Sequence, residues 1–326
     1  MKCLMFFCAG LFSTAVFATP TVSDVVARQV QPWNGVVDIT VTIRGSAEDV
    51  AGCGCTFTAT NSATRAALPV TKIHQAGGDT GSGTSWTRRF IWDARADVGE
   101  VKIDDVALTV GVKLLGGVRL WENGPYWATC NVGAKNPEEY GYYFWWGDTV
   151  GYKRNAENNG WVSAKDGSSF SFGSGNCPTF GKNDVQLLSE GYIDATGNLV
   201  AAHDAATAHL GAPWRMPTDA EFSALINNCD TEWSSHNGVP GRLIKGRGAY
   251  AAKSIFLPAA GYDDGYGPSL LNSGSRGGYW SSTPSSDSGY AWILDIDSND
   301  FRWSFRRSNG GRYGGFSVRP VRGFAK

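Results

Sequence analysis

The sequence predicts a mainly β protein with two domains, a β-sandwich followed by an α+β domain with two helices and a loop-rich antiparallel sheet. Three observations favour this class. At 326 residues with 42% apolar side chains, the chain is long enough to build more than one core. Many short runs alternate between apolar and polar residues, the pattern of half-buried strands. Glycine and tryptophan are abundant while only 18% of residues are charged, which is typical of strand- and loop-rich extracellular proteins.

The first 18 residues have the pattern of a secretory signal peptide. Lys2 supplies a positive start, residues 4–17 are mostly apolar, and Ala18 ends a small-residue cleavage pattern. The alternative, a membrane anchor, is disfavoured because the apolar run is short and Thr19-Pro20 ends it. We therefore expect cleavage after Ala18 and export to the cell surface or the exterior, with no membrane span afterwards.

The charge balance bears on the kind of partner. The formal net charge of the chain is −1. Because the charges nearly cancel, nothing favours nucleic acid or an anionic membrane surface. We expect a protein or carbohydrate ligand at the cell exterior, and no nucleic-acid partner.

Residues 20–114 are predicted to form the first domain. The expected strands occupy residues 22–31, 36–44, 55–60, 86–92 and 101–112. The clearest alternation is in Val37–Ile43, and Pro32–Gly35 and Gly77–Gly83 have turn chemistry. Short strands at this spacing favour a β-sandwich of immunoglobulin or fibronectin type, without a helix. We interpret this domain as a spacer.

Residues 116–326 are predicted to form the second domain, after a linker marked by Gly116-Gly117. Two helices are expected, one at Asp204–Leu210 and one that begins with the capping box Thr218-Asp219-Ala220-Glu221. Strands are expected around residues 118–121, 126–130, 140–146 and 256–261. The segment 151–181 is rich in glycine and asparagine and is predicted to be a long surface loop with little regular structure.

The C-terminal part of this domain is predicted to contain three short antiparallel strands. Tyr290–Ile296 and Phe301–Phe305 alternate on either side of the turn cluster Asp297–Asp300, which indicates a hairpin. A polar loop, residues 306–315, then leads to a last strand, residues 316–321.

Several motifs in this domain resemble one known family. They are Tyr279-Trp280-Ser281-Ser282-Thr283, Trp214-Arg215-Met216-Pro217-Thr218, Tyr126–Ala134, Glu138–Gly147 and the ending Gly315–Arg322. Together they resemble the Fibrobacter major paralogous domain family over roughly the last two thirds of the chain. The resemblance implies the C-type-lectin-like fold that is shared by formylglycine-generating enzyme and by the variable proteins of diversity-generating retroelements.

A departure from the resembled enzymes argues against catalysis. Enzymes of the formylglycine-generating type need C-terminal cysteine thiolates, because thiolate is the soft ligand that copper(I) selects. Here no cysteine follows Cys229, and Pro320 stands where the family's ending would carry one. We therefore predict no enzymatic activity. A divergent oxidase that has lost its copper cysteines remains an alternative, which copper-dependent oxygen uptake would reveal.

Other residue types give weaker indications of metal chemistry. Five cysteines lie beyond residue 18, namely Cys53, Cys55, Cys130, Cys177 and Cys229, and we favour small buried thiols or one structural bridge. The four histidines are scattered, so a zinc site is not predicted. The carboxylate pairs Asp263-Asp264 and Asp295/Asp297 are interpreted as solvated. Calcium is kept open as a cofactor, with ligands from Asp263, Asp264, Asp297 and Asp300.

The C-terminal strands and loops also carry the residue types that are enriched in recognition surfaces. Trp280, Trp292 and Phe316 are expected to be buried anchors of the fold. The predicted ligand-binding residues are Tyr290, Asp297, Ser298, Asn299, Arg302, Trp303, Arg306, Arg307, Asn309, Arg312 and Tyr313. In the retroelement variable proteins the corresponding region is the diversified ligand-binding face. The resemblance therefore implies a receptor, and the sequence of its binding face is either diversified or fixed. A carbohydrate-binding or adhesion component and a purely structural surface protein are the alternatives.

Overall fold

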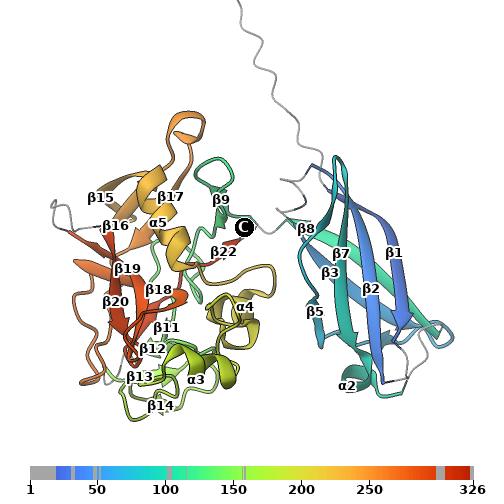
Figure 1. Ribbon diagram of the computed structural model, residues 1–326, viewed down its shortest axis with the longest axis horizontal. Helices are drawn as coiled ribbons and strands as arrows, with labels where there is room; N and C mark the ends of the chain where they lie inside the picture. Colours follow the sequence, from blue (N-terminus) through green and yellow to red (C-terminus); the bar gives the residue numbers. More distant parts are fainter. Residues whose placement is uncertain are drawn as a thin grey trace, which may run out of the picture. The chain divides into compact units, whose positions relative to one another are not determined.

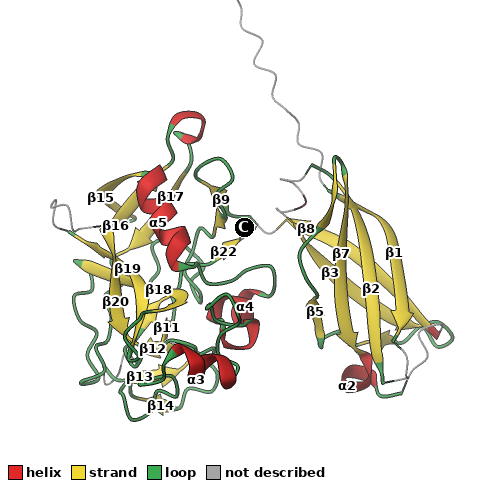
Figure 2. Cartoon of the chain, in the orientation of Figure 1, coloured by secondary structure: helices red, strands yellow, loops and turns green. Residues whose placement is uncertain are grey.

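The computed structural model describes residues 20–30, 34–46, 50, 53–100, 105–114, 116–155, 157, 159–298 and 305–323. The chain separates into two compact units between residues 112 and 113. Strands predominate in both units, and helices are few and short (Figures 1 and 2). The protein is therefore mainly β, as predicted. The predicted signal segment, residues 1–18, lies outside the described residues.

The N-terminal unit is built from two sheets around one core. The first sheet has the order β1-β2-β7-β5, with β6 also paired to β7, and the second has the order β4-β3-β8. Buried side chains of β2, β3, β7 and β8 belong to one apolar cluster. The strands are β1 (Thr21–Gln29), β2 (Val36–Arg44), β3 (Cys53–Asn61), β4 (Ala67–Leu68), β5 (Ile73–Gln75), β6 (Thr80–Ser82), β7 (Ser85–Asp93) and β8 (Val106–Leu114).

Strand β2 shows how the sequence pattern produces this core. Its alternate residues Val37, Ile39, Val41 and Ile43 are fully buried, whereas the residues between them are half-buried. Because side chains in a strand point alternately to opposite faces, one face of β2 supplies the core. The predicted alternation is confirmed.

A short helix in this unit was not predicted. Helix α2 (Ala94–Val98) follows β7 directly, and the Asp93 side chain caps it by accepting a hydrogen bond from Ala96 N–H. The Asp97 carboxylate accepts hydrogen bonds from the backbone N–H groups of Thr71 and Lys72 and from the indole N–H of Trp92. The expectation of a helix-free domain was wrong, because a five-residue segment held by capping and side-chain hydrogen bonds has no apolar periodicity to reveal it.

The C-terminal unit centres on an eight-stranded sheet with the order β14-β13-β12-β11-β21-β18-β19-β20. Strands β18, β19 and β20 lie side by side and are antiparallel, whereas β21 is parallel to β18 (Figure 1). The strands are β11 (Tyr143–Phe144), β12 (Tyr152–Arg154), β13 (Trp161–Ser163), β14 (Ser169–Phe170), β18 (Arg276–Pro284), β19 (Tyr290–Asp297), β20 (Phe305–Gly311) and β21 (Phe316–Ser317).

Two smaller sheets complete the strands of this unit. One has the order β22-β10-β9 and the other the order β15-β16-β17. Their strands are β9 (Val118–Arg119), β10 (Tyr126–Trp127), β15 (Asp230–His236), β16 (Val239–Lys245), β17 (Ser254–Pro258) and β22 (Val321–Arg322).

The described part of this unit contains three α-helices rather than the two expected. Helices α4 (Ala205–Leu210) and α5 (Asp219–Asn228) lie where they were predicted, and α3 (Asp184–Ser189) is additional. Two 3-10 turns occupy Ala201–His203 and Gly248–Tyr250. The predicted capping box of α5 is confirmed in both directions between Thr218 and Glu221. Helix α5 buries Phe222 and Leu225 against Tyr279, Leu294 and Ile296 of β18 and β19.

Three predictions about irregular and terminal segments were wrong. The segment 151–181, predicted to be a surface loop with little regular structure, contains the strands β12, β13 and β14 of the large sheet. Residues 305–311 form the strand β20, so most of the predicted loop 306–315 is strand. The last predicted strand divides into β21, which joins the large sheet, and β22, which pairs with β10. The strands β21 and β22 are held by partners distant in the chain, and β12, β13 and β14 are only two or three residues long, so local alternation does not reveal them.

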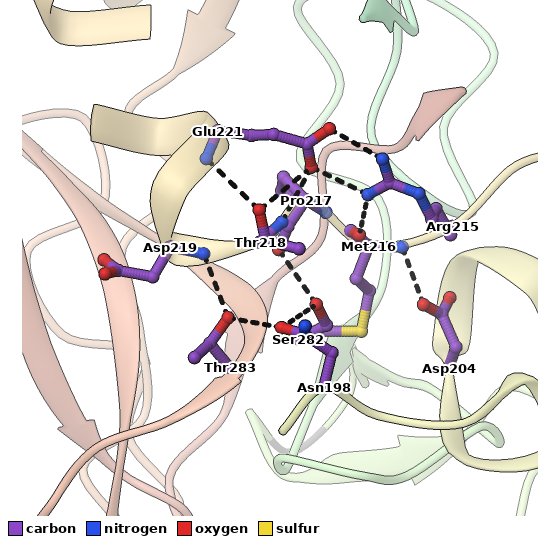
Figure 3. A network of polar contacts seen from close by, with 10 residues as sticks. All are labelled: Asn198, Asp204, Arg215, Met216, Pro217, Thr218, Asp219, Glu221, Ser282 and Thr283. Atoms are coloured by element: carbon purple, nitrogen blue, oxygen red, sulfur yellow. Dashed lines mark hydrogen bonds and ion pairs between the residues drawn. The ribbon is translucent and has the colours of Figure 1, made fainter. Parts of the chain in front are cut away.

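Two of the motifs that carry the family resemblance, Trp214–Thr218 and Tyr279–Thr283, take part in a hydrogen-bond network between α4, α5 and β18 (Figure 3). Arg215 makes a bidentate ion pair with Glu221, at 2.6 and 2.7 Å. The buried Asp204 carboxylate accepts from Thr207 N–H at the start of α4 and from Met216 N–H. Thr283 Oγ1 accepts from Asp219 N–H and donates to Asn198. These residues therefore hold elements of the fold together.

Buried arginines have the same structural role at the C-terminal end. Arg319 is 0% exposed and donates to Asn131 Oδ1 and to the carbonyl oxygens of Ala128, Thr129 and Phe256. Burial lowers its pKa to about 10. Arg322, also buried, donates to the Gly116 carbonyl oxygen. Both side chains join the last residues of the chain to the start of the unit.

Candidate functional site

The two faces of the β18–β19–β20 layer divide the predicted ligand-binding residues. Cross-strand pairs place Gly278, Asp295 and Arg306 on one face and Tyr279, Leu294 and Arg307 on the other. Helix α5 covers the second face. The predicted residues therefore do not form one continuous surface.

The first face contains a pocket of about 220 Å³ between β18–β20 and the segment 262–266. Two predicted residues, Asn309 and Tyr313, contribute to its wall, as does Asp264, which was proposed as a calcium ligand. Six further residues that line it were not predicted to belong to a site: Tyr262, Tyr266, Arg276, Ile293, Asp295 and Ser308. The pocket is the strongest candidate for a functional site.

A pair of tyrosines forms the rim of the pocket. The side chain of Tyr266 is 83% exposed, whereas that of Tyr313 is buried. Their phenol oxygens lie 3.1 Å apart, and their rings meet edge to face with centroids 6.0 Å apart. The hydrogen bond with Tyr266, together with burial, raises the pKa of Tyr313 to about 12. A mostly exposed aromatic ring is thus held in place by a buried one.

Glycines allow the ring of Tyr313 to lie this close to the backbone. A Cβ atom at Gly265 would meet the ring at 2.4 Å, and one at Gly311 would meet it at 2.9 Å. Gly265 also has a φ of +77°, which favours glycine. The segment 262–266 is therefore packed directly on Tyr313.

The floor of the pocket contains a buried charged group. Asp295 is 1% exposed and makes a bidentate ion pair with Arg276, at 2.7 and 2.8 Å. Arg306 approaches the same carboxylate at 3.3 Å from the neighbouring strand. Asp295 was expected to be solvated, and this was wrong because the two guanidinium groups replace water around its carboxylate.

Asp263 was also expected to be solvated and is instead fully buried. Its two carboxylate oxygens accept hydrogen bonds from the indole N–H of Trp161 and from Gly265 N–H, both at 2.7 Å. Burial raises its pKa despite these hydrogen bonds. Its role is to fix the turn that carries Tyr266, rather than to face a ligand.

Arg312 was predicted to be displayed, and this was wrong. It is 0% exposed and donates to the backbone carbonyl oxygens of Thr179, Lys182 and Tyr290. Its guanidinium group lies 4.8 Å from the ring centroid of Trp146, and burial lowers its pKa to about 10. Composition alone cannot distinguish a buried arginine that donates to backbone carbonyl groups from an exposed arginine that binds a ligand. The sequence therefore did not reveal that Arg312 is buried.

The remaining predicted residues are distributed over the unit. Tyr290 is 39% exposed at the start of β19, and Ser298 is exposed after its end. Arg307 forms an ion pair with Asp219 of α5, and its guanidinium group lies 4.7 Å from the ring centroid of Trp292. Asp297 is half-buried, and its carbonyl oxygen accepts from Arg242. Asn299, Arg302 and Trp303 lie outside the described residues, as does Asp300 of the proposed calcium set.

The predicted anchors of the fold are mostly confirmed. Trp280 and Phe316 are buried in one apolar cluster, with ring centroids 4.5 Å apart. Trp292 is only half-buried, because Arg307 rather than an apolar element covers its ring.

In the part of the chain that the structure describes, no two cysteines are joined by a disulfide. Cys53, Cys177 and Cys229 are buried, and Cys55 and Cys130 are half-buried. Burial raises the pKa of Cys55 and of Cys229 to about 11, and it also raises the pKa of Cys177. These three thiols therefore stay protonated near neutral pH, as expected for small buried side chains.

The histidines have separate surroundings. His203 and His209 contact the backbone carbonyl oxygens of Gly147 and Thr149, and His236 lies 3.8 Å from Glu138. Among the described residues, no three histidine, cysteine or acidic side chains are grouped so that they could hold a metal ion.

The sequence contained a signal for the unpredicted part of the pocket. Gly261–Gly267 reads Gly-Tyr-Asp-Asp-Gly-Tyr-Gly, a short run in which aromatic, acidic and glycine residues are interleaved. Such a run is typical of a tight loop that displays its aromatic rings. Arg276 and Ser308 carried no comparable signal, since only the strand register brings them to the pocket.

No helix in the described part of the chain is long and apolar enough to span a membrane. Comparison of the chain with protein-family models, with curated proteins and with solved structures found no match.

Proposed function

We propose that this chain is an exported, non-catalytic binding protein whose C-terminal unit takes an extracellular ligand at the pocket between Tyr266, Tyr313 and the strands β18–β20. The N-terminal unit, as an immunoglobulin- or fibronectin-like β-sandwich, serves as a spacer in this proposal. The signal-peptide pattern of residues 1–18 supports export.

One observation carries the binding function. Tyr266 displays 83% of its side chain at the rim of a pocket, yet its phenol is hydrogen-bonded to a buried tyrosine. An aromatic ring in water contributes nothing to the core, and large rings that are displayed in a fixed position are typical of binding hot spots. Tyrosine is also favoured in binding surfaces because few rotatable bonds must be fixed when a ligand binds.

The family resemblance supports the same function. The motifs around Trp214–Thr218 and Tyr279–Thr283 would belong to a C-type-lectin-like fold of the Fibrobacter major paralogous type, in which they tie helices to the sheet. Within that fold, the C-terminal strands would carry the variable binding surface, as in the retroelement variable proteins. We propose the pocket as the part of this surface that contacts the ligand.

The absence of catalysis is part of the proposal. The chain has no cysteine after Cys229 with which to bind copper at the place where formylglycine-generating enzymes do. The buried thiols of Cys177 and Cys229 have raised pKa values and are poor sources of thiolate. In the pocket, the Asp295 carboxylate is already engaged in ion pairs with Arg276 and Arg306.

A binding assay with natural surfaces tests this function. Fluorescently labelled full-length protein is titrated onto isolated bacterial cell envelopes and onto plant cell-wall particles, with an excess of unlabelled protein as competitor. Saturable binding that Tyr266→Ala abolishes is the expected result. Leu210→Ala is the control, because Leu210 is exposed at the end of α4 and is not in the pocket wall.

Two outcomes would contradict the proposal. One is an absence of saturable binding to either surface. The other is saturable binding that Tyr266→Ala leaves unchanged, since the ligand would then lie elsewhere on the protein.

A further inference from the structure

We propose that the ligand of the Tyr266–Tyr313 pocket is a neutral carbohydrate, bound as a single sugar unit within or at the end of a glycan. This inference rests on the proposed binding function and adds the chemical class of the ligand. Three properties of the pocket carry it, namely its charge balance, its two-way hydrogen-bonding groups and its displayed ring.

The charges around the pocket cancel. Arg276 and Arg306 both contact the Asp295 carboxylate, and Asp264 is the second acidic residue in the wall. The formal charges of the two guanidinium groups and the two carboxylates therefore sum to zero. An anionic ligand would have to compete with Asp295 for Arg276, and a cationic ligand would find only Asp264. The arrangement therefore favours a ligand without formal charge.

The tyrosine pair supplies a hydrogen-bonding group that both donates and accepts. When two hydroxyl groups lie 3.1 Å apart, one proton lies between their oxygens and the other proton points elsewhere. The pair thus offers one donor proton and additional acceptor lone pairs to a ligand. Sugar hydroxyl groups also donate and accept, so they match this pair better than a carboxylate or an ammonium group, each of which can play only one role.

Asp264 supplies an acceptor on the same side. One of its carboxylate oxygens accepts a hydrogen bond from Tyr266 N–H at 3.1 Å, which fixes the carboxylate next to the displayed ring. A carboxylate held in this way can accept two hydrogen bonds from adjacent sugar hydroxyls through its remaining lone pairs. The hydroxyl of Ser308 adds a further hydrogen-bonding group on the strand side of the pocket.

The ring of Tyr266 provides an apolar surface beside these polar groups. Sugars present an apolar face of C–H groups together with hydroxyls at the ring edge, so they can stack on an aromatic ring and hydrogen-bond at the same time. The volume of about 220 Å³ is below the roughly 300–1,000 Å³ that is typical of pockets for drug-sized ligands. A single sugar unit is a ligand of suitable size and chemistry.

Affinity electrophoresis of the full-length protein tests this assignment. Native gels are cast with neutral polysaccharides (xylan, galactomannan and mixed-linkage β-glucan) or with anionic ones (alginate and polygalacturonate). We expect retardation by at least one neutral polymer and none by the anionic polymers. Tyr266→Ala should abolish the retardation, Leu210→Ala should preserve it, and Tyr313→Phe should weaken binding by about 3- to 10-fold, as for one lost hydrogen bond.

Treatment of the surfaces with periodate or protease distinguishes a failure of the carbohydrate assignment from a failure of the binding function on which it rests. Periodate cleaves sugar diols, so treatment of the envelopes or cell walls with periodate should remove Tyr266-dependent binding, and treatment with protease should not. Binding that depends on Tyr266 but is lost only after protease would overturn the carbohydrate assignment and leave the binding function standing. Retardation only by anionic polymers, or by none of the polymers, would also overturn the assignment.

Discussion

The phenol oxygens of Tyr266 and Tyr313 lie 3.1 Å apart, although 47 residues separate them in the chain. Gly265 and Gly311 allow this contact, because a side chain at either position would collide with the Tyr313 ring. The pair joins a loop to the end of β20 and fixes the one tyrosine of the pocket that is almost fully displayed.

The first prediction concerns the ionisation of Tyr313. Its pKa is raised from an ordinary value of 10.0 to about 12, mainly by the hydrogen bond with Tyr266. Because the folded-state pKa lies above the unfolded one, this effect stabilises the fold fully below pH 10 and is lost as the pH rises from about 10 to about 12. In Tyr266→Phe the pKa of Tyr313 should fall. Ultraviolet titration of tyrosinate in wild type and in Tyr266→Phe measures this difference, and a variant curve that differs only by the lost absorbance of Tyr266 itself would contradict the geometry.

The second prediction concerns the close packing behind the pocket. A Cβ atom at Gly278 would lie 2.3 Å from the ring of Phe316, whereas one at Gly267 would meet nothing within 4 Å. Gly278→Ala should lower the free energy of unfolding by about 1–3 kcal/mol, because the ring must move from its place against Trp280 and Tyr262. Gly267→Ala is the control and should change stability by about 0.5 kcal/mol or less. Chemical denaturation of both variants checks the contrast.

The third prediction concerns the network of Figure 3. Glu221 closes the capping box of α5 and is the partially buried partner of Arg215. Removing the Glu221 carboxylate takes an acceptor from the backbone N–H of Thr218 and from the guanidinium of Arg215. Glu221→Ala should therefore lower the free energy of unfolding by about 2–4 kcal/mol. The matched control is Glu232→Ala, which breaks an exposed pair with Lys245 and should cost about 0–1 kcal/mol. Equal losses in the two variants would show that the network is not structural.

The fourth prediction concerns the buried guanidinium group of Arg319. Lysine cannot reproduce its planar set of donors to Asn131 and to three carbonyl oxygens, so Arg319→Lys should destabilise the fold by about 2–4 kcal/mol. Arg247 also donates to two carbonyl oxygens, but its side chain is half exposed. Water can replace its contacts, and Arg247→Lys should cost about 1 kcal/mol or less. Thermal unfolding of the two variants measures and compares these losses of stability.

Local signals in the sequence predicted part of the fold correctly. The capping box at Thr218–Glu221 and the alternation of Val37–Ile43 both describe contacts between residues a few positions apart. One strong local signal was overlooked. Asn237-Gly238 separates β15 from β16, and both residues have positive φ values, as in the tight turns that favour asparagine and glycine. The sequence alone was sufficient to predict that hairpin.

The candidate site was less predictable, because tertiary contacts decide which side chains are displayed. Arg312 and Tyr313 adjoin a glycine-rich segment that looked like an exposed loop, yet carbonyl groups and aromatic rings from distant segments enclose both. Arg306 and Arg307 are neighbours in sequence but lie on opposite faces of β20. Which face is covered depends on the packing of α5, which the alternation of residues within β20 does not reveal.

The central claim is that the ligand contacts the displayed ring of Tyr266. The most direct measurement is the equilibrium dissociation constant of the full-length protein for the surface or polysaccharide that retains it, compared among wild type, Tyr266→Ala and Leu210→Ala. We predict that Tyr266→Ala weakens binding by at least about tenfold, as for an aromatic hot spot, and that Leu210→Ala leaves it unchanged. Equal affinities for wild type and Tyr266→Ala would contradict the account.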